Sequence, residues 1–151
     1  MQIRTKRFGT VEVDPERVLT FPEGLIGFPD FREYVVMEFD VRDDCVRWLQ
    51  SVSEPALGFV VMDPKAAFPG YDPDFSPDDL VPLGVGTPDD LVVLAVATVP
   101  KDVRKMTLNL QAPLLINPGR KLGRQVIVAS PEYSTRHYVF SALEALLRRT
   151  G

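Results

Sequence analysis

The sequence predicts a mainly β protein: a small single domain resembling an antiparallel β-barrel, with short helical turns and a short C-terminal helix. The chain has 151 residues, which fits one domain of roughly 100–150 residues. Fourteen residues are proline, and interior prolines break long helices. About eight to ten short segments rich in β-branched and aromatic residues lie between turns, which is typical of a sandwich or closed barrel.

Alternating apolar residues and turn residues give the order of the strands. Gly9 separates two alternating stretches and predicts a hairpin, and Asp14-Pro15 predicts a turn. Residues 23–33 are loop-like, since glycine and proline recur there. The clearest alternation covers 106–111, where every second residue is apolar. The expected strands are residues 2–8, 10–13, 18–21, 34–41, 46–52, 58–62, 91–99, 106–111, 114–116 and 124–129.

Short helical turns are expected where a capping residue precedes proline and two acids. Ser76-Pro77-Asp78-Asp79 predicts a short helix to about Leu83, and Thr87-Pro88-Asp89-Asp90 repeats the pattern before a strand. At the end of the chain, the pattern Ser141-Ala-Leu-Glu144 resembles a capping box. It predicts the short C-terminal helix over 142–149.

Charge is distributed unevenly behind a net value of −4. Residues 63–90 carry one lysine against seven aspartates, a net charge of −6, whereas residues 101–151 carry +6. This acidic segment disfavours direct nucleic-acid binding, which needs a basic face. Two interpretations stay open: the paired aspartates are solvated helix caps, or the segment is an acidic docking face for a protein partner.

The residues that support catalysis are scarce. His137 is the only histidine and Cys45 the only cysteine, so neither a zinc site nor a Ser-His-Asp triad is expected. No nucleotide-binding glycine loop occurs. We therefore expect no enzyme activity, cofactor or metal, and His137 is expected to be a hydrogen-bonded structural residue. A flavin-like cofactor-binding barrel or enzyme, and a purely structural interaction module, remain the alternatives.

The same features bear on location. A lone cysteine favours a reducing compartment. No apolar run approaches the roughly 18–20 residues of a membrane span, and the N-terminal residues lack an apolar signal region. The expectation is a cytoplasmic protein that binds no membrane.

Five stretches resemble a known family. They are FPEGLIGF at 21–28, WLQSV at 48–52, FVVMDP at 59–64, TVPKDVRKMTLNLQAPLLIN at 98–117 and GRQVIV at 123–128. In this order the stretches are similar to the bacterial flagellar assembly factor FliW family. The resemblance implies a FliW-like β-barrel domain over 1–137, followed by a C-terminal helical tail over 138–151.

The resemblance also implies a function without catalysis. Members of the family bind flagellin in the cytoplasm before its export. They also bind the translational regulator CsrA, antagonise its RNA binding non-competitively, and so relieve repression of flagellin translation. The implied partners are these two proteins, with no nucleic acid, membrane or small-molecule substrate.

Two sets of site residues are expected on this basis. The basic character that CsrA needs for RNA points to the acidic segment, with Asp72, Asp74, Asp78, Asp79, Asp89 and Asp90 as contacts. Flagellin has amphipathic ends, for which the candidates are Phe21, Leu25, Phe28, Met106, Asn109 and Gln111. The alternative for the apolar members of this second set is that they fill the barrel, and for the amides that they are solvated.

Overall fold

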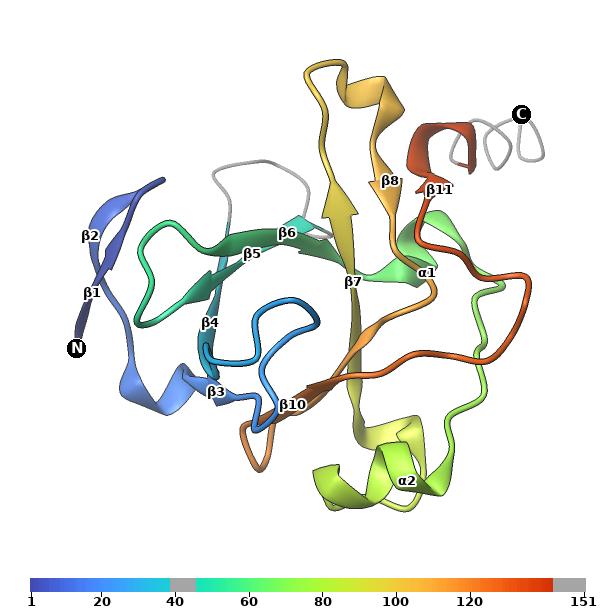
Figure 1. Cartoon of the computed structure of the whole chain (residues 1–151), viewed down its shortest axis with the longest axis horizontal. Helices are drawn as coiled ribbons and strands as arrows, with labels where there is room; N and C mark the ends of the chain where they lie inside the picture. Colours follow the sequence, from blue (N-terminus) through green and yellow to red (C-terminus); the bar gives the residue numbers. More distant parts are fainter. Residues whose placement is uncertain (39–45, 143–151) are drawn as a thin grey trace.

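A computed structural model describes residues 1–38 and 46–142 of the chain. Seven strands close into a barrel (Figure 1). They are β3 (Leu19–Thr20), β4 (Glu33–Glu38), β5 (Val46–Ser51), β6 (Gly58–Met62), β7 (Val92–Thr98), β9 (Leu114–Asn117) and β10 (Leu122–Gln125). The pairing of β7 with β9 completes the ring. The predicted mainly β, barrel-like fold is confirmed.

One pairing in this ring departs from the antiparallel expectation. Strands β3 and β10 run parallel through the register pair Leu122 and Thr20, and the Thr20 N–H donates to the Lys121 carbonyl at 2.9 Å. All other neighbouring strands are antiparallel. This parallel seam joins the first part of the chain to the last part of the barrel.

Four further strands lie outside the ring. Strands β1 (Gln2–Thr5) and β2 (Gly9–Glu12) form the predicted hairpin, a separate two-stranded sheet. Strands β8 (Thr107–Leu108) and β11 (His137–Tyr138) extend the sheet beyond β7. Strand β11 crosses the position at which the C-terminal tail was expected to begin, and residues 139–142 are helical.

Short helices begin where the sequence predicts them. Helix α2 (Pro77–Leu80) carries a complete capping box between Ser76 and Asp79, and a 3₁₀ turn continues it to Leu83. Thr87 caps the 3₁₀ turn Pro88–Asp90. Helix α1 (Pro64–Ala67) was not predicted, although Asp63 caps it before a proline in the same way.

Three predicted strands are wrong in extent. The strand expected over 2–8 ends at Thr5, because the Thr5 hydroxyl accepts the Phe8 N–H and donates to the Gly9 carbonyl, which closes the turn of the hairpin. The segment 106–111 contains only the two-residue β8, because the Asn109 side chain accepts the N–H groups of Gln111 and Ala112 and turns the chain. Strand β10 ends at Gln125, earlier than the expected 124–129. The expected strand residues 39–41 and all but the first residue of the helix over 142–149 lie outside the described residues.

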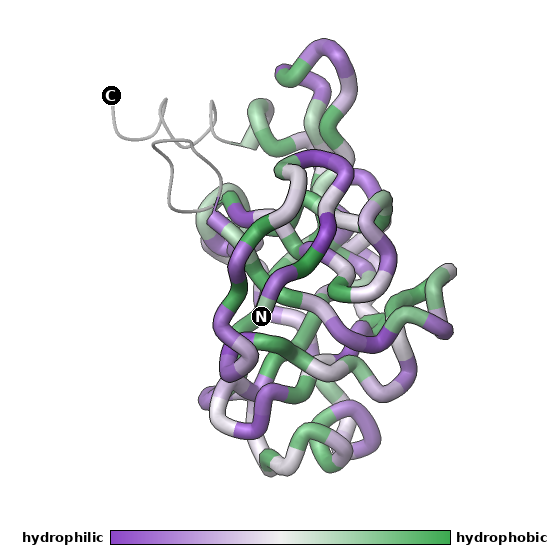
Figure 2. Tube along the Cα trace, turned by 90° about the vertical axis from the view of Figure 1, so that its left-hand side faces the viewer, coloured by the Kyte–Doolittle hydropathy of each residue, from purple (hydrophilic) through white to green (hydrophobic). Residues whose placement is uncertain are grey.

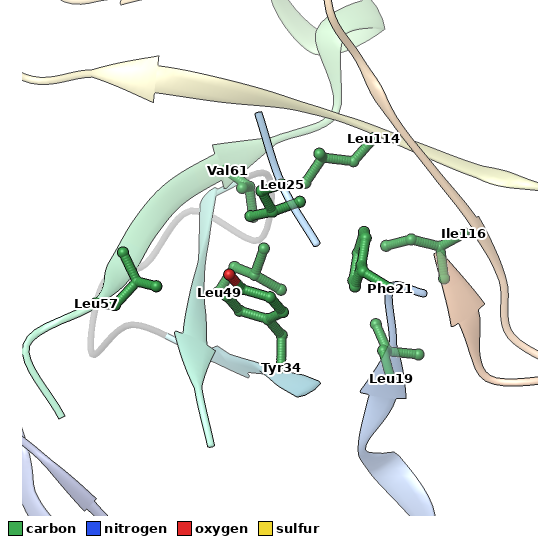
Figure 3. Close-up of a cluster of buried hydrophobic side chains, with 9 residues drawn as sticks. All are labelled: Leu19, Phe21, Leu25, Tyr34, Leu49, Leu57, Val61, Leu114 and Ile116. Carbon is green, nitrogen blue, oxygen red and sulfur yellow. The ribbon is translucent and has the colours of Figure 1, made fainter. Parts of the chain in front are cut away.

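Apolar side chains from every side of the barrel meet in its interior. Figure 3 shows nine buried residues of this cluster. The Phe21 ring packs edge-on against Tyr34 with centroids 5.5 Å apart, and burial raises the pKa of Tyr34 to about 12. Gly123 makes room for this ring, because a Cβ atom there would lie 2.4 Å from Phe21. Figure 2 shows the short intervals at which hydrophobic and hydrophilic residues alternate along the chain.

A buried amide organises the turn after β5. The Gln50 Oε1 atom accepts the Trp48 indole N–H at 2.8 Å, and its Nε2 donates to the Ser51 and Leu57 carbonyls, each at 3.1 Å. Buried polar groups need such partners. Trp48 and Gln50 of the WLQSV stretch therefore have a structural role.

Candidate partner-binding surfaces

The FPEGLIGF loop closes one end of the barrel. It connects β3 to β4 and lies across the middle of the barrel in Figure 1. Gly24 and Gly27 have φ values of +68° and +89°. Leu25 and Phe28, the residues that follow these two glycines, pair with each other in an isolated β-bridge. The Phe28 ring packs edge-on against Phe59, with centroids 5.7 Å apart. The glycines, the bridge and the aromatic contact thus hold the loop in one conformation over the end of the barrel.

The apolar residues of this loop divide into an inner and an outer set. Phe21 and Leu25, both expected to contact flagellin, are buried in the core cluster. Phe28 is 37% exposed, and Ile26, which was not singled out, is 56% exposed. The outer set is Ile26 and Phe28, and the inner set holds the loop in place.

A glutamine joins this loop to the 106–115 block. The Gln125 Oε1 atom accepts the Ile26 N–H at 2.8 Å, and its Nε2 atom donates to the Ala112 carbonyl at 3.1 Å. Ile127 lies two residues further along the chain, past the end of β10, and is 67% exposed. We call Ile26, Phe28, Gln125 and Ile127 the loop-end surface. Sequence reasoning missed the last two because it treated them as ordinary strand residues.

The other predicted flagellin residues have varied surroundings. Asn109 is half-buried and its side-chain oxygen holds the turn described above. The Gln111 N–H also donates to the Ser134 carbonyl at 3.1 Å. Met106 packs in a second cluster with Met62 and Leu108, separate from the barrel interior. The structure joins the loop to Ala112 and does not place Met106 in the loop-end surface.

The six aspartates expected to contact CsrA fall into separate groups. Asp79 is half-buried in its capping box, whereas the other five are exposed. At α2, the Arg124 guanidinium donates to the Asp78 carbonyl and lies 3.7 Å from a Glu23 carboxylate oxygen. A cation therefore contacts the backbone of α2 at Asp78.

Asp72 and Asp89 instead lie around a hollow of about 530 Å³. We call it the acidic hollow. Its walls include the apolar residues Tyr71, Phe75, Leu91 and Val93. Asp63 lies on the same rim, and Lys65 is the basic residue among the described lining residues. The structure thus joins part of the predicted acidic face to an apolar depression.

Two absences hold for the residues that the structure describes. No three or more His, Cys, Asp or Glu side chains converge in the described ranges to hold a metal ion. No helix within residues 1–38 and 46–142 has both the length and the apolar character to cross a membrane.

Comparison with known proteins places this fold. A family model described as FliW protein matches residues 2–139. The chain belongs to the FliW family. The flagellar assembly factor FliW of Alkaliphilus metalliredigens is 35% identical over 151 residues, covering 100% of this chain and 93% of that protein. That of Syntrophotalea carbinolica is 45% identical over 131 residues, covering 87% and 92%.

A solved structure of the FliW family agrees with the barrel. A crystal structure of the flagellar assembly factor FliW has a TM-score of 0.86 and 34% sequence identity to this chain. The match covers 93% of this chain and 97% of the chain in that crystal structure. The resemblance expected from the five sequence stretches is therefore confirmed.

His137 has a structural role in this FliW-family chain, as expected. Its Nε2 atom accepts the Ser134 N–H at 2.9 Å, which requires that this nitrogen carry no proton while the hydrogen bond is made. Its ring packs edge-on against Phe68, with centroids 5.6 Å apart. Burial lowers the pKa of His137 from its ordinary value of 6.5.

This lowered pKa of His137 predicts a pH-dependent stability. The unfolded chain takes up the proton as pH falls through about 6.5, before the folded chain does. The contribution of neutral His137 to stability is complete above that pH and is lost as pH falls toward the lower folded pKa. We expect His137→Gln to reduce the loss of unfolding free energy between about pH 7.5 and pH 5.5, measured by urea titration. Arg136→Gln is the control, and an equal loss in wild type and His137→Gln would contradict this assignment.

Proposed function

We propose that this chain is a cytoplasmic flagellar assembly factor that binds flagellin and, when flagellin has left, binds CsrA. Binding of CsrA antagonises its RNA binding non-competitively and relieves repression of flagellin translation. The observation that carries the proposal is membership of the FliW family over residues 2–139. Relatives that match most of this chain are named flagellar assembly factors.

The loop-end surface supports the binding of flagellin. Exposed apolar side chains grouped at one place mark protein interaction sites. Ile26 and Phe28 are exposed in the loop, and Ile127 is exposed two residues after Gln125, which binds the Ile26 N–H. An amphipathic helix lays its apolar face on exposed apolar residues of this kind. Phe21 and Leu25 then act from inside, by keeping the loop in shape.

The acidic segment supports the binding of CsrA. A protein that holds RNA needs a basic surface, and exposed aspartates attract it and repel RNA phosphate. Asp72, Asp74, Asp78, Asp79, Asp89 and Asp90 are the proposed contacts. By linkage, binding that weakens the CsrA–RNA complex is itself weakened by RNA to the same factor.

A competition experiment tests the function as a whole. The full chain is immobilised and offered purified flagellin, purified CsrA, or both, and CsrA–RNA affinity is measured with and without the chain. We expect each protein to be retained alone, flagellin to displace CsrA, and the chain to weaken RNA binding. Retention of neither protein would overturn the proposal. Visible-range absorbance of the purified chain would instead favour the alternative of a flavin-binding barrel.

The loop-end surface predicts a selective loss of flagellin binding. Ile26→Asp places a charge where an apolar contact is proposed, and we expect flagellin affinity to fall at least about tenfold. Val81→Asp is the matched control, because Val81 is 70% exposed and belongs to a 3₁₀ turn outside this surface. Isothermal titration measures both variants, and an equal effect of the two would contradict the placement.

A further inference from the structure

A second cavity opens at the barrel end opposite the FPEGLIGF loop. It measures about 600 Å³, and we call it the barrel mouth. Leu19, Val36, Leu94 and Ile116 give it apolar walls. These residues come from strands β3, β4, β7 and β9, so the mouth leads into the barrel interior. Mouths of β-barrels are common binding sites.

The barrel mouth and the acidic hollow share lining residues where β6 ends beside β7. Strand β6 ends at Met62, which pairs with Ala95, so the first three residues of β7 extend past it. Those residues, 92–94, pair with β9 on their other side. Val92 and Leu94 line both cavities, as does Asp63 beside them. Asp63, Val92 and Leu94 thus lie between the two cavities, which we treat together as one groove, and Val92 is 44% exposed.

Charge changes along this groove. Among the described residues, the mouth is lined by equal numbers of acidic and basic side chains, and Glu16 is ion-paired with Lys121 there. At the acidic hollow, Asp63, Asp72 and Asp89 face one described lysine, Lys65. An apolar floor with one acidic end complements a segment that is apolar along one stripe and basic at one end.

We propose that this groove is a docking site for an amphipathic helix of a partner protein. Its apolar stripe lies over Val92 and Leu94, and its basic end lies at the acidic hollow. Apolar residues at i, i+3, i+4 and i+7 fill such adjoining depressions in succession. The site is distinct from the loop-end surface, and its chemistry does not depend on which protein supplies the helix.

Synthetic peptides test the groove independently of flagellin and CsrA. The probe is a fluorescein-labelled amphipathic peptide of about 18 residues, about 27 Å long as a helix, with leucines along one stripe and three lysines at one end. Two control peptides replace the lysines by glutamates or the leucines by serines. We expect the probe to bind the full chain at least about tenfold more tightly than either control, by fluorescence anisotropy.

Matched variants locate the bound peptide. Val92→Asp is expected to weaken the probe about tenfold, and Asp72→Lys to weaken it and reduce its salt dependence. Val81→Asp and Asp78→Lys make the same changes outside the groove and are expected to leave binding within about twofold. Circular dichroism verifies that each variant is folded. Absence of probe binding, or equal effects inside and outside the groove, would overturn the proposal. Neither result would alter the outcome of the flagellin and CsrA competition.

Discussion

Gly24→Ala is expected to destabilise the protein more than any exposed substitution in the loop. Gly24 has φ +68°, and a Cβ atom there would lie 2.4 Å from the Phe28 carbonyl oxygen and 2.7 Å from the Pro29 Cα atom. Both atoms belong to the backbone of the same loop, so the loop must shift to accommodate the added methyl group. We expect a loss of at least about 3 kcal/mol in unfolding free energy, which lowers the melting temperature by roughly 6–12 °C.

Two other glycines separate backbone strain from steric overlap. Gly27 has φ +89° but nothing within 4 Å of its would-be Cβ atom, so Gly27→Ala is expected to cost about 1–2 kcal/mol. Gly70 has neither constraint, and Gly70→Ala is expected to stay within about 0.5 kcal/mol. Calorimetry of the three variants should give this order. A Gly24→Ala variant as stable as Gly27→Ala would contradict the packing of the loop.

Reversing charge in the acidic segment is expected to have the largest effect on the binding of CsrA. We expect replacement of Asp72, Asp74, Asp78 and Asp79 by lysine to weaken CsrA binding on the order of a hundredfold at low ionic strength. The cause is lost attraction to a basic partner, so the effect should shrink as salt is added. Titration calorimetry at two salt concentrations measures it.

Flagellin binding supplies the internal control for this charge reversal. The loop-end surface contains none of the four aspartates, so flagellin affinity is expected to be retained. Because Arg124 stands close to Asp78, Asp72→Lys alone should weaken CsrA binding more than Asp78→Lys alone. Unchanged CsrA affinity and unchanged salt dependence in the fourfold variant would rule out the acidic face as the CsrA contact.

The local parts of this fold were predictable because they depend on neighbouring residues. Capping residues before prolines begin α2 and the 3₁₀ turn Pro88–Asp90, and Gly9 marks the first hairpin. The parallel pairing of Leu122 with Thr20 was not predictable, because it joins distant residues with no shared pattern. The strand predicted over 106–111 is too long because its apolar residues alternate as in a strand. The Asn109 side chain accepts backbone N–H groups there and turns the chain.

The candidate site was harder to predict for a related reason. In an irregular loop, hydropathy does not distinguish a residue that faces the core from one that faces solvent. Phe21 and Leu25 point inward and Ile26 outward only because the glycines fix the course of the backbone. Gln125 gains importance through a hydrogen bond to a residue 99 positions away. Such contacts require coordinates.

The parallel pairing of β3 with β10 also determines when the barrel can close during synthesis of the chain. Leu122 must leave the ribosome before it can meet Thr20, and Gln125 must follow before it can hold Ile26. Synthesis proceeds at about 5–20 residues per second, and pairings between distant residues form slowly. Until then the barrel stays open, and the FPEGLIGF loop lacks the hydrogen bond between Gln125 and Ile26. The loop-end surface is therefore complete only after Gln125 has been made and has reached Ile26.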